Sequence, residues 1–161
     1  MKTSIQPQKI KQSWSIKEIQ EAATKMVSHK IASRIHFLEN HHDREVDDME
    51  KAAAHFGSEV LQRSGVKTPL DLVKYLAGYE VNMFGSEASI SGDDDSATLI
   101  NEKSTVWLET KRANSFSDAQ VEKMHEHYTA WMKHLGHKFD FKVHVEIAKD
   151  GNSSTVTFTN K

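Results

Sequence analysis

The segment Phe116–Gly136, FSDAQVEKMHEHYTAWMKHLG, decides the fold of this chain. Ser117 and Gln120 have the spacing of a capping box, and Gly136 is the residue type that most often follows the end of a helix. The apolar side chains between these signals recur every three or four positions, as on one face of a helix. They are Val121, Met124, Tyr128, Trp131, Met132 and Leu135. The pattern predicts an amphipathic helix whose apolar face packs on the rest of the domain.

The segment that follows predicts the sheet on which this helix packs. Residues 139–147, FDFKVHVEI, alternate apolar and polar side chains, which is typical of a strand with one buried face. Asp150 and Gly151 form a type I′ turn signal. Counting outward from this turn pairs Ile147 with Ser154, Val145 with Val156, and Val143 with Phe158. Both strands then place their apolar residues on the same face, as a stable hairpin requires.

The N-terminal half predicts three helices. Ser15 and Glu18 have the spacing of a capping box, which indicates the start of the first helix. The second begins near Asp43, and Thr68 with Pro69 begins a short third helix. The residues expected to face inward are Val46, Met49, Ala53, Phe56 and Val60 on the second helix, and Leu70, Val73, Leu76 and Ala77 on the third.

Beyond the third helix the pattern changes to that of strands. Three strands of a meander are predicted over residues 81–90, 97–101 and 105–110, with an acidic turn over residues 92–95. The complete order is ααα-βββ-α-ββ. It predicts an α+β fold with helices packed on one face of an antiparallel sheet of about five strands. We expect one domain over residues 15–161, after a mobile N-terminal arm over residues 1–14.

Composition narrows the classes of function. A chain of 161 residues is long enough to bury its own core, and the absence of cysteine excludes disulfides, thiol catalysis and thiolate metal sites. A formal charge of -2 does not suggest a basic face for nucleic acid. No apolar run approaches the length of a membrane span, and the N-terminus lacks the apolar core of a signal peptide. We expect a cytoplasmic protein that binds neither nucleic acid nor membrane.

The histidine content is high, and it raises the question of a metal site. Ten histidines would move the formal charge from -2 to +8 if all were protonated. Two Glu-x-x-His motifs, Glu39–His42 and Glu122–His125, have the spacing that holds dinuclear metal centres in helical bundles. Glu122 and His125 are therefore candidate ligands for a divalent zinc, iron or manganese ion. The alternative is that these side chains belong to solvated surfaces.

A small-molecule pocket is predicted between the sheet and the long helix, near His125. Tyr128, Trp131 and Phe141 supply the apolar walls that such pockets use, and His125 with Glu122 supplies polar groups beside them. The ligand-binding residues expected from the sequence are thus His125, Tyr128, Trp131 and Phe141. His127 and His134 fall on the opposite side of the helical stripe, where we expect them to face water.

A family resemblance supports the same interpretation. The segments that carry it are AAAHFGSEVL at 52–61, TPLDLVKYLAGYEV at 68–81, SDAQVEKMHEHYTAWMKHLG at 117–136 and KDGNSSTVTF at 149–158. In order and spacing they resemble the bacterial α+β domains grouped with L-2-amino-thiazoline-4-carboxylate hydrolase and, more distantly, the 4-vinyl reductase-type ligand-binding domains. The resemblance implies a small-molecule pocket between helices and sheet. It does not imply a thiol-dependent reaction, because the family's cysteines are replaced here by Lys111-Arg112, His125 and Ser154-Thr155.

Three functions stay open at this stage. The first is a small-molecule-binding α+β domain, with a hydrolase-like enzyme as one version of it. The second is a metal-dependent enzyme that uses Glu122 and His125. The third is a non-catalytic interaction protein that forms a homodimer through a second apolar face of the first helix, made by Ile31, Ile35 and Leu38.

Overall fold

A computed structural model describes residues 14–39, 43–149 and 151–161 of the chain. Its elements in order are α1 (Ile16–Leu38), α2 (Asp43–Arg63), α3 (Pro69–Phe84), β1 (Glu87–Gly92), β2 (Ser96–Lys103), α4 (Thr105–Asn114), α5 (Asp118–Lys138), β3 (Phe141–Ile147) and β4 (Ser154–Asn160). The expected α+β class is confirmed. The predicted N-terminal arm lies almost entirely outside the described residues.

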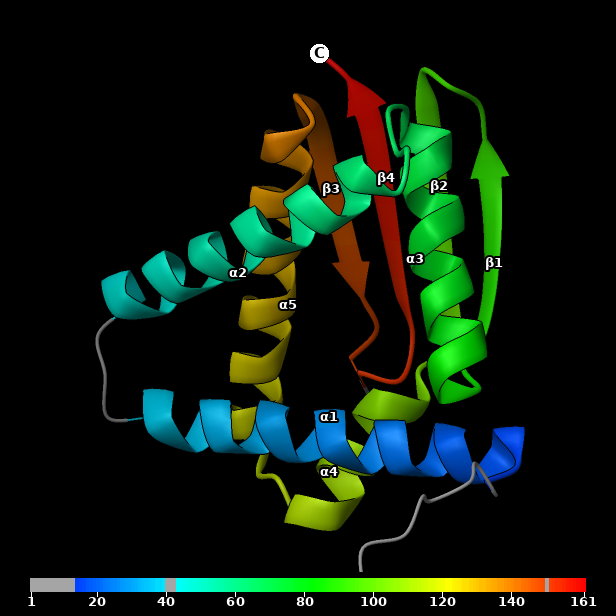
Figure 1. Cartoon of the computed structure of the whole chain (residues 1–161). Helices are drawn as coiled ribbons and strands as arrows, with labels where there is room; N and C mark the ends of the chain where they lie inside the picture. The colour runs from blue at the N-terminus through cyan, green and yellow to red at the C-terminus, as the bar shows by residue number, and fades with distance from the viewer. Residues whose placement is uncertain (1–13, 40–42, 150) are drawn as a thin grey trace, which may run out of the picture.

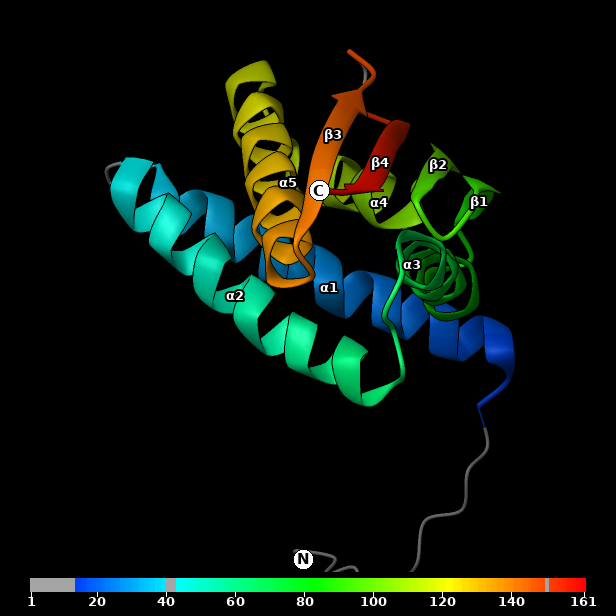
Figure 2. The same ribbon diagram turned by 90° about the horizontal axis from the view of Figure 1, so that it is seen from above.

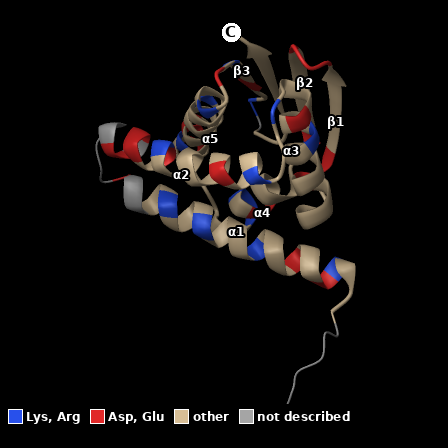
Figure 3. Cartoon of the chain, turned by 45° about the horizontal axis from the view of Figure 1, so that its top comes forward, with Lys and Arg blue, Asp and Glu red and all other residues tan. Residues whose placement is uncertain are grey.

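The sheet is antiparallel throughout, with the strand order β1-β2-β4-β3. α3 and α5 lie along one face of the sheet, α2 crosses over α5, and α1 and α4 lie across one end (Figures 1 and 2). In the view of Figure 3, acidic and basic residues are interspersed along the helices, and the β1–β2 turn is acidic. Within the described residues, no helix is both long enough and apolar enough to cross a membrane.

The local signals at helix starts are confirmed. Ser15 with Glu18, Thr68 with Asp71 and Ser117 with Gln120 each form a complete capping box in which side chain and backbone bond reciprocally. These bonds satisfy backbone N–H groups that the first helical turn leaves without partners. The sequence therefore sets where α1, α3 and α5 begin.

The C-terminal hairpin has the register that the sequence predicts. Ile147 pairs with Ser154, Val145 with Val156, and Val143 with Phe158. Gly151 adopts a left-handed φ of 65°, as a tight turn requires, whereas Asp150 lies outside the described residues. The apolar side chains of both strands consequently share the face that α5 covers.

The main core lies between this face, α3 and α5. Its fully or almost fully buried members include Leu72, Val73, Leu99, Leu135, Val156 and Phe158. Gly136 belongs to the same contact surface, and α5 continues past it to Lys138, so the prediction that Gly136 ends the helix is wrong. A methyl group at Gly136 would overlap the side chain of Val143. Glycine is needed here because α5 approaches β3 too closely for a side chain.

The middle of the chain departs from the predicted strand pattern. Residues 105–110 form the first turns of α4, so within the described residues the meander has two strands and the sheet has four, not five. Val106, Leu108 and Thr110 alternate as in a strand, but the Ser104 side chain caps a helix by accepting from the Trp107 N–H. The third helix is also longer than predicted, because it continues to Phe84 before Gly85 ends it in a left-handed conformation.

The buried face of α2 differs from the prediction as well. Phe56 and Val60 are 68% and 55% exposed, whereas Glu50, Ala54 and Ser58 are buried. The inward face of this helix mixes the apolar Ala54 and Leu61 with the polar Glu50 and Ser58, so its largest apolar side chain, Phe56, indicates the wrong side. Glu50 points toward α5, where it meets a histidine partner described below.

The residues expected to form a dimer surface are used within the chain. Ile35 is 2% exposed and belongs to a second buried cluster with Phe84, Val106, Trp107 and Met124, against which Ile31 packs. The side chain of Leu38 lies outside the described residues. This packing accounts for two of the three apolar side chains on which the dimer prediction rests.

Candidate functional site

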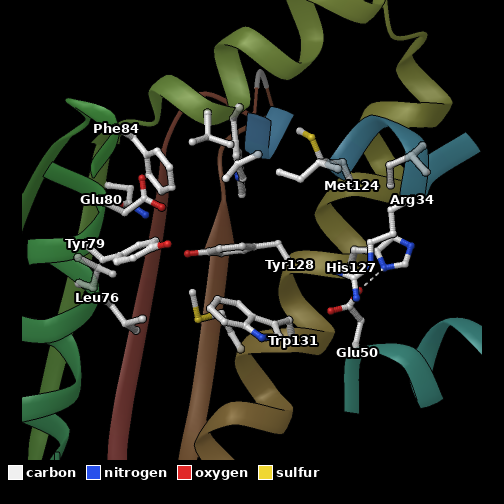
Figure 4. A pocket seen from close by; sticks show the side chains of 18 residues that line it. Arg34, Glu50, Leu76, Tyr79, Glu80, Phe84, Met124, His127, Tyr128 and Trp131 are labelled. Atoms are coloured by element: carbon white, nitrogen blue, oxygen red, sulfur yellow. Dashed lines mark hydrogen bonds and ion pairs between the residues drawn. The ribbon is translucent and has the colours of Figure 1, made fainter. Parts of the chain in front are cut away.

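A cavity of about 290 Å³ lies between α1, α3, α4, α5 and β2, with α2 at one edge (Figure 4). Its volume is close to the lower end of the range of about 300–1,000 Å³ that is typical of ligand pockets. The apolar part of its wall includes Val27, Ile31, Leu76, Leu99, Val106 and Met124. The second buried cluster and the main core thus meet around this cavity.

Aromatic rings form much of the wall. Trp107 and Tyr128 meet edge to face, with ring centroids 4.8 Å apart and planes at 89°. On α3, Tyr79 and Phe84 meet in the same way at 5.3 Å. Trp131 completes the set from α5. Tyr79 is 48% exposed, so it stands at the edge of the cavity. Such walls suit a flat or compact apolar molecule.

Glu80 places a carboxylate in this apolar wall. Its described contact is a 2.9 Å hydrogen bond that Ser86 Oγ donates to Oε2. Burial raises the pKa of Glu80, because desolvation penalises the charged form, and the Ser86 bond opposes the shift. Among the described residues, no cationic side chain forms an ion pair with Glu80. The carboxylate is therefore balanced only by a hydroxyl.

Tyr128 and Asn101 add further polar atoms to the interior. Burial raises the pKa of Tyr128, and the charge of Glu80 adds to this effect, whereas the nearby Ser154 and Asn101 side chains oppose it. Neither neighbour is placed well enough to form a hydrogen bond, and within the described residues the Tyr128 hydroxyl and Asn101 Oδ1 are buried without a partner. Figure 4 shows the hydroxyls of Tyr79 and Tyr128 pointing toward one another. Unpaired polar atoms in an apolar cavity cost free energy that a polar ligand group recovers.

A second polar group lies at the α2 edge. His127 Nδ1 is 2.9 Å from Glu50 Oε1, and Arg34 Nη2 is 3.2 Å from the same oxygen. His127 and Glu50 are 7% and 2% exposed. Because a carboxylate only accepts, we assign the bonded proton to Nδ1, which makes Nε2 an acceptor in the neutral ring. Within the described residues, this buried Nε2 has no hydrogen-bond partner.

The sequence-predicted ligand residues divide between two places. Tyr128 and Trp131 line the cavity. Phe141 is 4% exposed in the main core and is not part of the cavity wall. His125 stacks on Trp107, with ring centroids 5.6 Å apart, and is not part of the cavity wall. The structure thus brings together two of the four.

The metal candidates lie in a shallow surface groove. Glu122 and His125 line it together with Asp47, His134 and His137. Asp47 Oδ1 is 2.7 Å from His134 Nε2 across the groove. Within the described residues, no set of three or more histidine, aspartate or glutamate side chains is placed to hold a metal ion. The motif at Glu39–His42 falls partly outside the described residues.

Sequence reasoning missed several of the polar groups at the cavity. It expects His127 to face water, and this prediction is wrong because α2 covers that side of α5. A signal was present, since His127 lies three residues after Met124 and four before Trp131. Glu80 carries a similar signal, four residues before Phe84 on one helix face. The predicted strand over residues 81–90 hid this signal, because it placed Phe84 outside the third helix.

The comparisons with known proteins leave the family open. No protein-family model matches this chain, and no curated protein sequence matches it. The resemblance to the L-2-amino-thiazoline-4-carboxylate hydrolase group stays a prediction. Function must be argued from the cavity and its polar groups.

Proposed function

We propose that this protein binds a small, largely apolar molecule in the cavity between α1, α3, α4, α5 and β2. One observation carries the proposal: the cavity combines an aromatic wall with buried polar atoms of Tyr128, Asn101 and His127 that have no partner among the described residues. Proteins satisfy most buried polar groups, so several orphaned atoms around one cavity favour a ligand that pairs with them. A molecule of roughly one or two rings fits this volume.

The test is a ligand-observed NMR screen with a library of small amines, alcohols, carboxylates and aromatic compounds. Val27→Trp places a large ring in the cavity from α1 and should abolish binding of the compounds found with the wild type. Val60→Trp, on the exposed side of α2, adds the same ring elsewhere and should leave binding unchanged. Circular dichroism checks that each variant is folded. If Val27→Trp unfolds, Ile31→Phe replaces it.

The outcomes separate the possible sites. If Val27→Trp loses binding and Val60→Trp keeps it, the ligand binds in the cavity. Equal binding to both variants would place it elsewhere, and His125→Ala then tests the surface groove, as the sequence predicts for that residue. A screen without hits would contradict the proposal.

A hydrolase-like enzyme is the second candidate, favoured by the Glu50–His127 pair. Glu50 holds the Nδ1–H of His127, which leaves Nε2 as an acceptor in a buried cavity. In this role Nε2 takes a proton from a water molecule while the water oxygen attacks a carbonyl carbon and opens its C=O bond to an oxyanion, and Glu50 stabilises the imidazolium that forms. When the C=O bond forms again, the bond to the leaving alcohol breaks, and the imidazolium returns the proton to the leaving oxygen. The orientation of histidine by a carboxylate is the same device that serine hydrolases use.

Turnover of short-chain p-nitrophenyl esters tests this candidate. His127→Gln should abolish activity above the uncatalysed rate, and Glu50→Gln should reduce it by about two orders of magnitude or more. His134→Gln is the matched control, because it changes a histidine of the same helix outside the cavity. Activity that persists in His127→Gln would remove the enzyme proposal and leave the binding proposal intact.

The metal-dependent enzyme and the homodimer also stay proposals. Elemental analysis of untagged protein decides whether Glu122 and His125 hold zinc, iron or manganese. For the homodimer, the supporting observation moves to α2, where Phe56 and Val60 lie one helical turn apart and are exposed. Light scattering that gives the mass of one chain at micromolar concentration would contradict a dimer.

A further inference from the structure

The charges around the cavity are unevenly balanced. At the α2 edge, Glu50 is balanced by Arg34, whose Nη2 is 3.2 Å away, and by His127. Arg34 is the only lysine or arginine among the described lining residues, so the wall has no further cation. On the α3 side, Glu80 has no such partner within the described residues and receives one bond from Ser86. The cavity therefore offers a negative group at one side that the chain itself does not neutralise.

The surroundings of Glu80 suit a positive charge. Phe84 and Tyr79 lie beside it on α3, and Tyr128 and Trp131 face it from α5 (Figure 4). The faces of aromatic rings attract cations, and more strongly where water is excluded. The hydroxyls of Tyr79 and Tyr128 add acceptors for ammonium N–H groups. A carboxylate in an aromatic wall is the arrangement that recognises organic ammonium groups.

The same features disfavour other charge classes. An anionic ligand would place a second negative charge beside Glu80, and the single arginine of the wall is already bonded to Glu50. A neutral ligand would leave the half-buried carboxylate without an opposite charge. A cation offsets the desolvation of the Glu80 carboxylate directly, because it supplies the missing opposite charge.

We propose that the ligand of this cavity is a small organic amine, bound as its ammonium form with the charge at Glu80 and the apolar part between Tyr128, Trp131 and Trp107. This inference rests on the proposed binding function and adds the chemical class of the ligand. The aromatic set contacts the hydrocarbon part, and Glu80 determines the selection for positive charge. The burial that raises the pKa of Glu80 in the empty protein is offset when the ammonium group binds.

Three probes of nearly the same size and shape test the proposed chemical class of the ligand. They are 2-phenylethylamine, 2-phenylethanol and phenylacetate, which differ in the charge of the terminal group. Isothermal titration calorimetry at pH 7 should give the tightest binding for the amine, weaker binding for the alcohol and the weakest for the carboxylate. Glu80→Gln keeps the shape of the side chain and should lower the affinity for the amine at least about tenfold, as the loss of a charged hydrogen bond predicts.

Glu87→Gln is the matched control, because it removes the same charge from β1 at a position 65% exposed to solvent, and it should leave amine binding unchanged. Thermal unfolding verifies that Glu80→Gln is folded, and Tyr128→Phe provides a second cavity variant that keeps the ring. Equal affinity for amine and alcohol, unchanged amine binding in Glu80→Gln, or no binding of the amine would each overturn the ammonium assignment. The broad screen judges the binding function separately, because hits that are neutral or acidic would sustain it while refuting the amine.

Discussion

The C-terminal end and the middle of α5 show opposite ways of using the same helix. At its C-terminal end, Leu135 is fully buried and Gly136 approaches β3 so closely that no side chain fits between them. Two turns earlier, Tyr128 and Trp131 face a cavity with polar atoms that lack partners among the described residues. Dense packing stabilises the fold, whereas a cavity lined by unpaired polar groups reduces stability. The packed end supports the domain, and the hollow part is where binding is expected.

The largest effect should come from the packed end. Phe158→Ala removes a ring that is fully buried against α5 and the hairpin. We expect a loss of about 3–5 kcal/mol in the free energy of unfolding, measured by urea denaturation. An effect below about 1 kcal/mol would show that this end of the core is not closely packed.

The second-largest loss of stability should come from the His127–Glu50 pair at the edge of the cavity. His127→Ala leaves the buried Glu50 carboxylate with Arg34 alone, at a cost of about 2–3 kcal/mol in the same assay. His134→Ala is the control on the same helix, because its partner Asp47 is exposed, and it should change stability by less than about 0.5 kcal/mol. Equal effects would mean that burial of His127 does not distinguish the two sites.

A pair of glycine variants sharpens the contrast in packing. Gly136→Ala should cost about 1–2 kcal/mol, because the new methyl group overlaps Val143. Gly57→Ala lies in α2, where no atom would come within 4 Å of the methyl group, and should stabilise the protein by up to about 1 kcal/mol. Thermal unfolding midpoints that move in opposite directions support the comparison, and a shared direction contradicts it.

The smallest effect concerns the pH dependence at Glu80. Because the pKa of this carboxyl is raised in the folded protein, the folded state holds its proton more tightly than the unfolded state does. Its contribution to stability is therefore greatest below the unfolded pKa and declines as pH rises through the folded pKa. Glu80→Gln cannot titrate, so the difference in unfolding free energy between variant and wild type should favour the variant more at pH 7 than at pH 4.

Several exposed carboxyls shift in the opposite direction and do not affect this comparison. Hydrogen bonds lower the pKa values of Asp71 and Asp93, and Lys161 lowers that of Asp140. These groups are unchanged by the substitution, so their contributions cancel in the difference. The Tyr128 hydroxyl does not titrate in this range because its pKa is raised. Urea denaturation of both proteins at the two pH values gives the result, and a constant difference would contradict the assignment to Glu80.

The sequence predicts the packed regions well, for a physical reason. Alternation in β3 and β4 fixes the register of Val143 with Phe158, because a shift by one residue would turn every apolar side chain to the other face. Caps such as Ser117 with Gln120 depend only on residues three apart, so they can be identified without tertiary structure. Local chemistry and burial agree at these positions.

The candidate site is predicted poorly because local chemistry and burial disagree there. Glu50 is a buried carboxylate on a helix whose largest apolar residue, Phe56, is exposed, so Phe56 indicates the wrong face of α2. His127 is buried because α2 packs over it, and within α5 the one signal is its position three residues after Met124 and four before Trp131. Residues 105–110 alternate like a strand, yet tertiary packing of Trp107 favours a helix. Positions where sequence rules fail are where functional groups concentrate.

The walls of the cavity come from α1 to α5 and from β2, so they span the sequence from Val27 to Met132. This arrangement has a kinetic consequence. Partly folded chains lack some of the walls, so a ligand adds its binding free energy only after the domain is assembled. It then lowers the unfolding rate and leaves the folding rate unchanged. At a free concentration of about 100 times its Kd, the added stability is about 2.7 kcal/mol, which corresponds to unfolding roughly a hundredfold slower. If the proposed function holds, occupancy of the cavity would lengthen the lifetime of the folded protein.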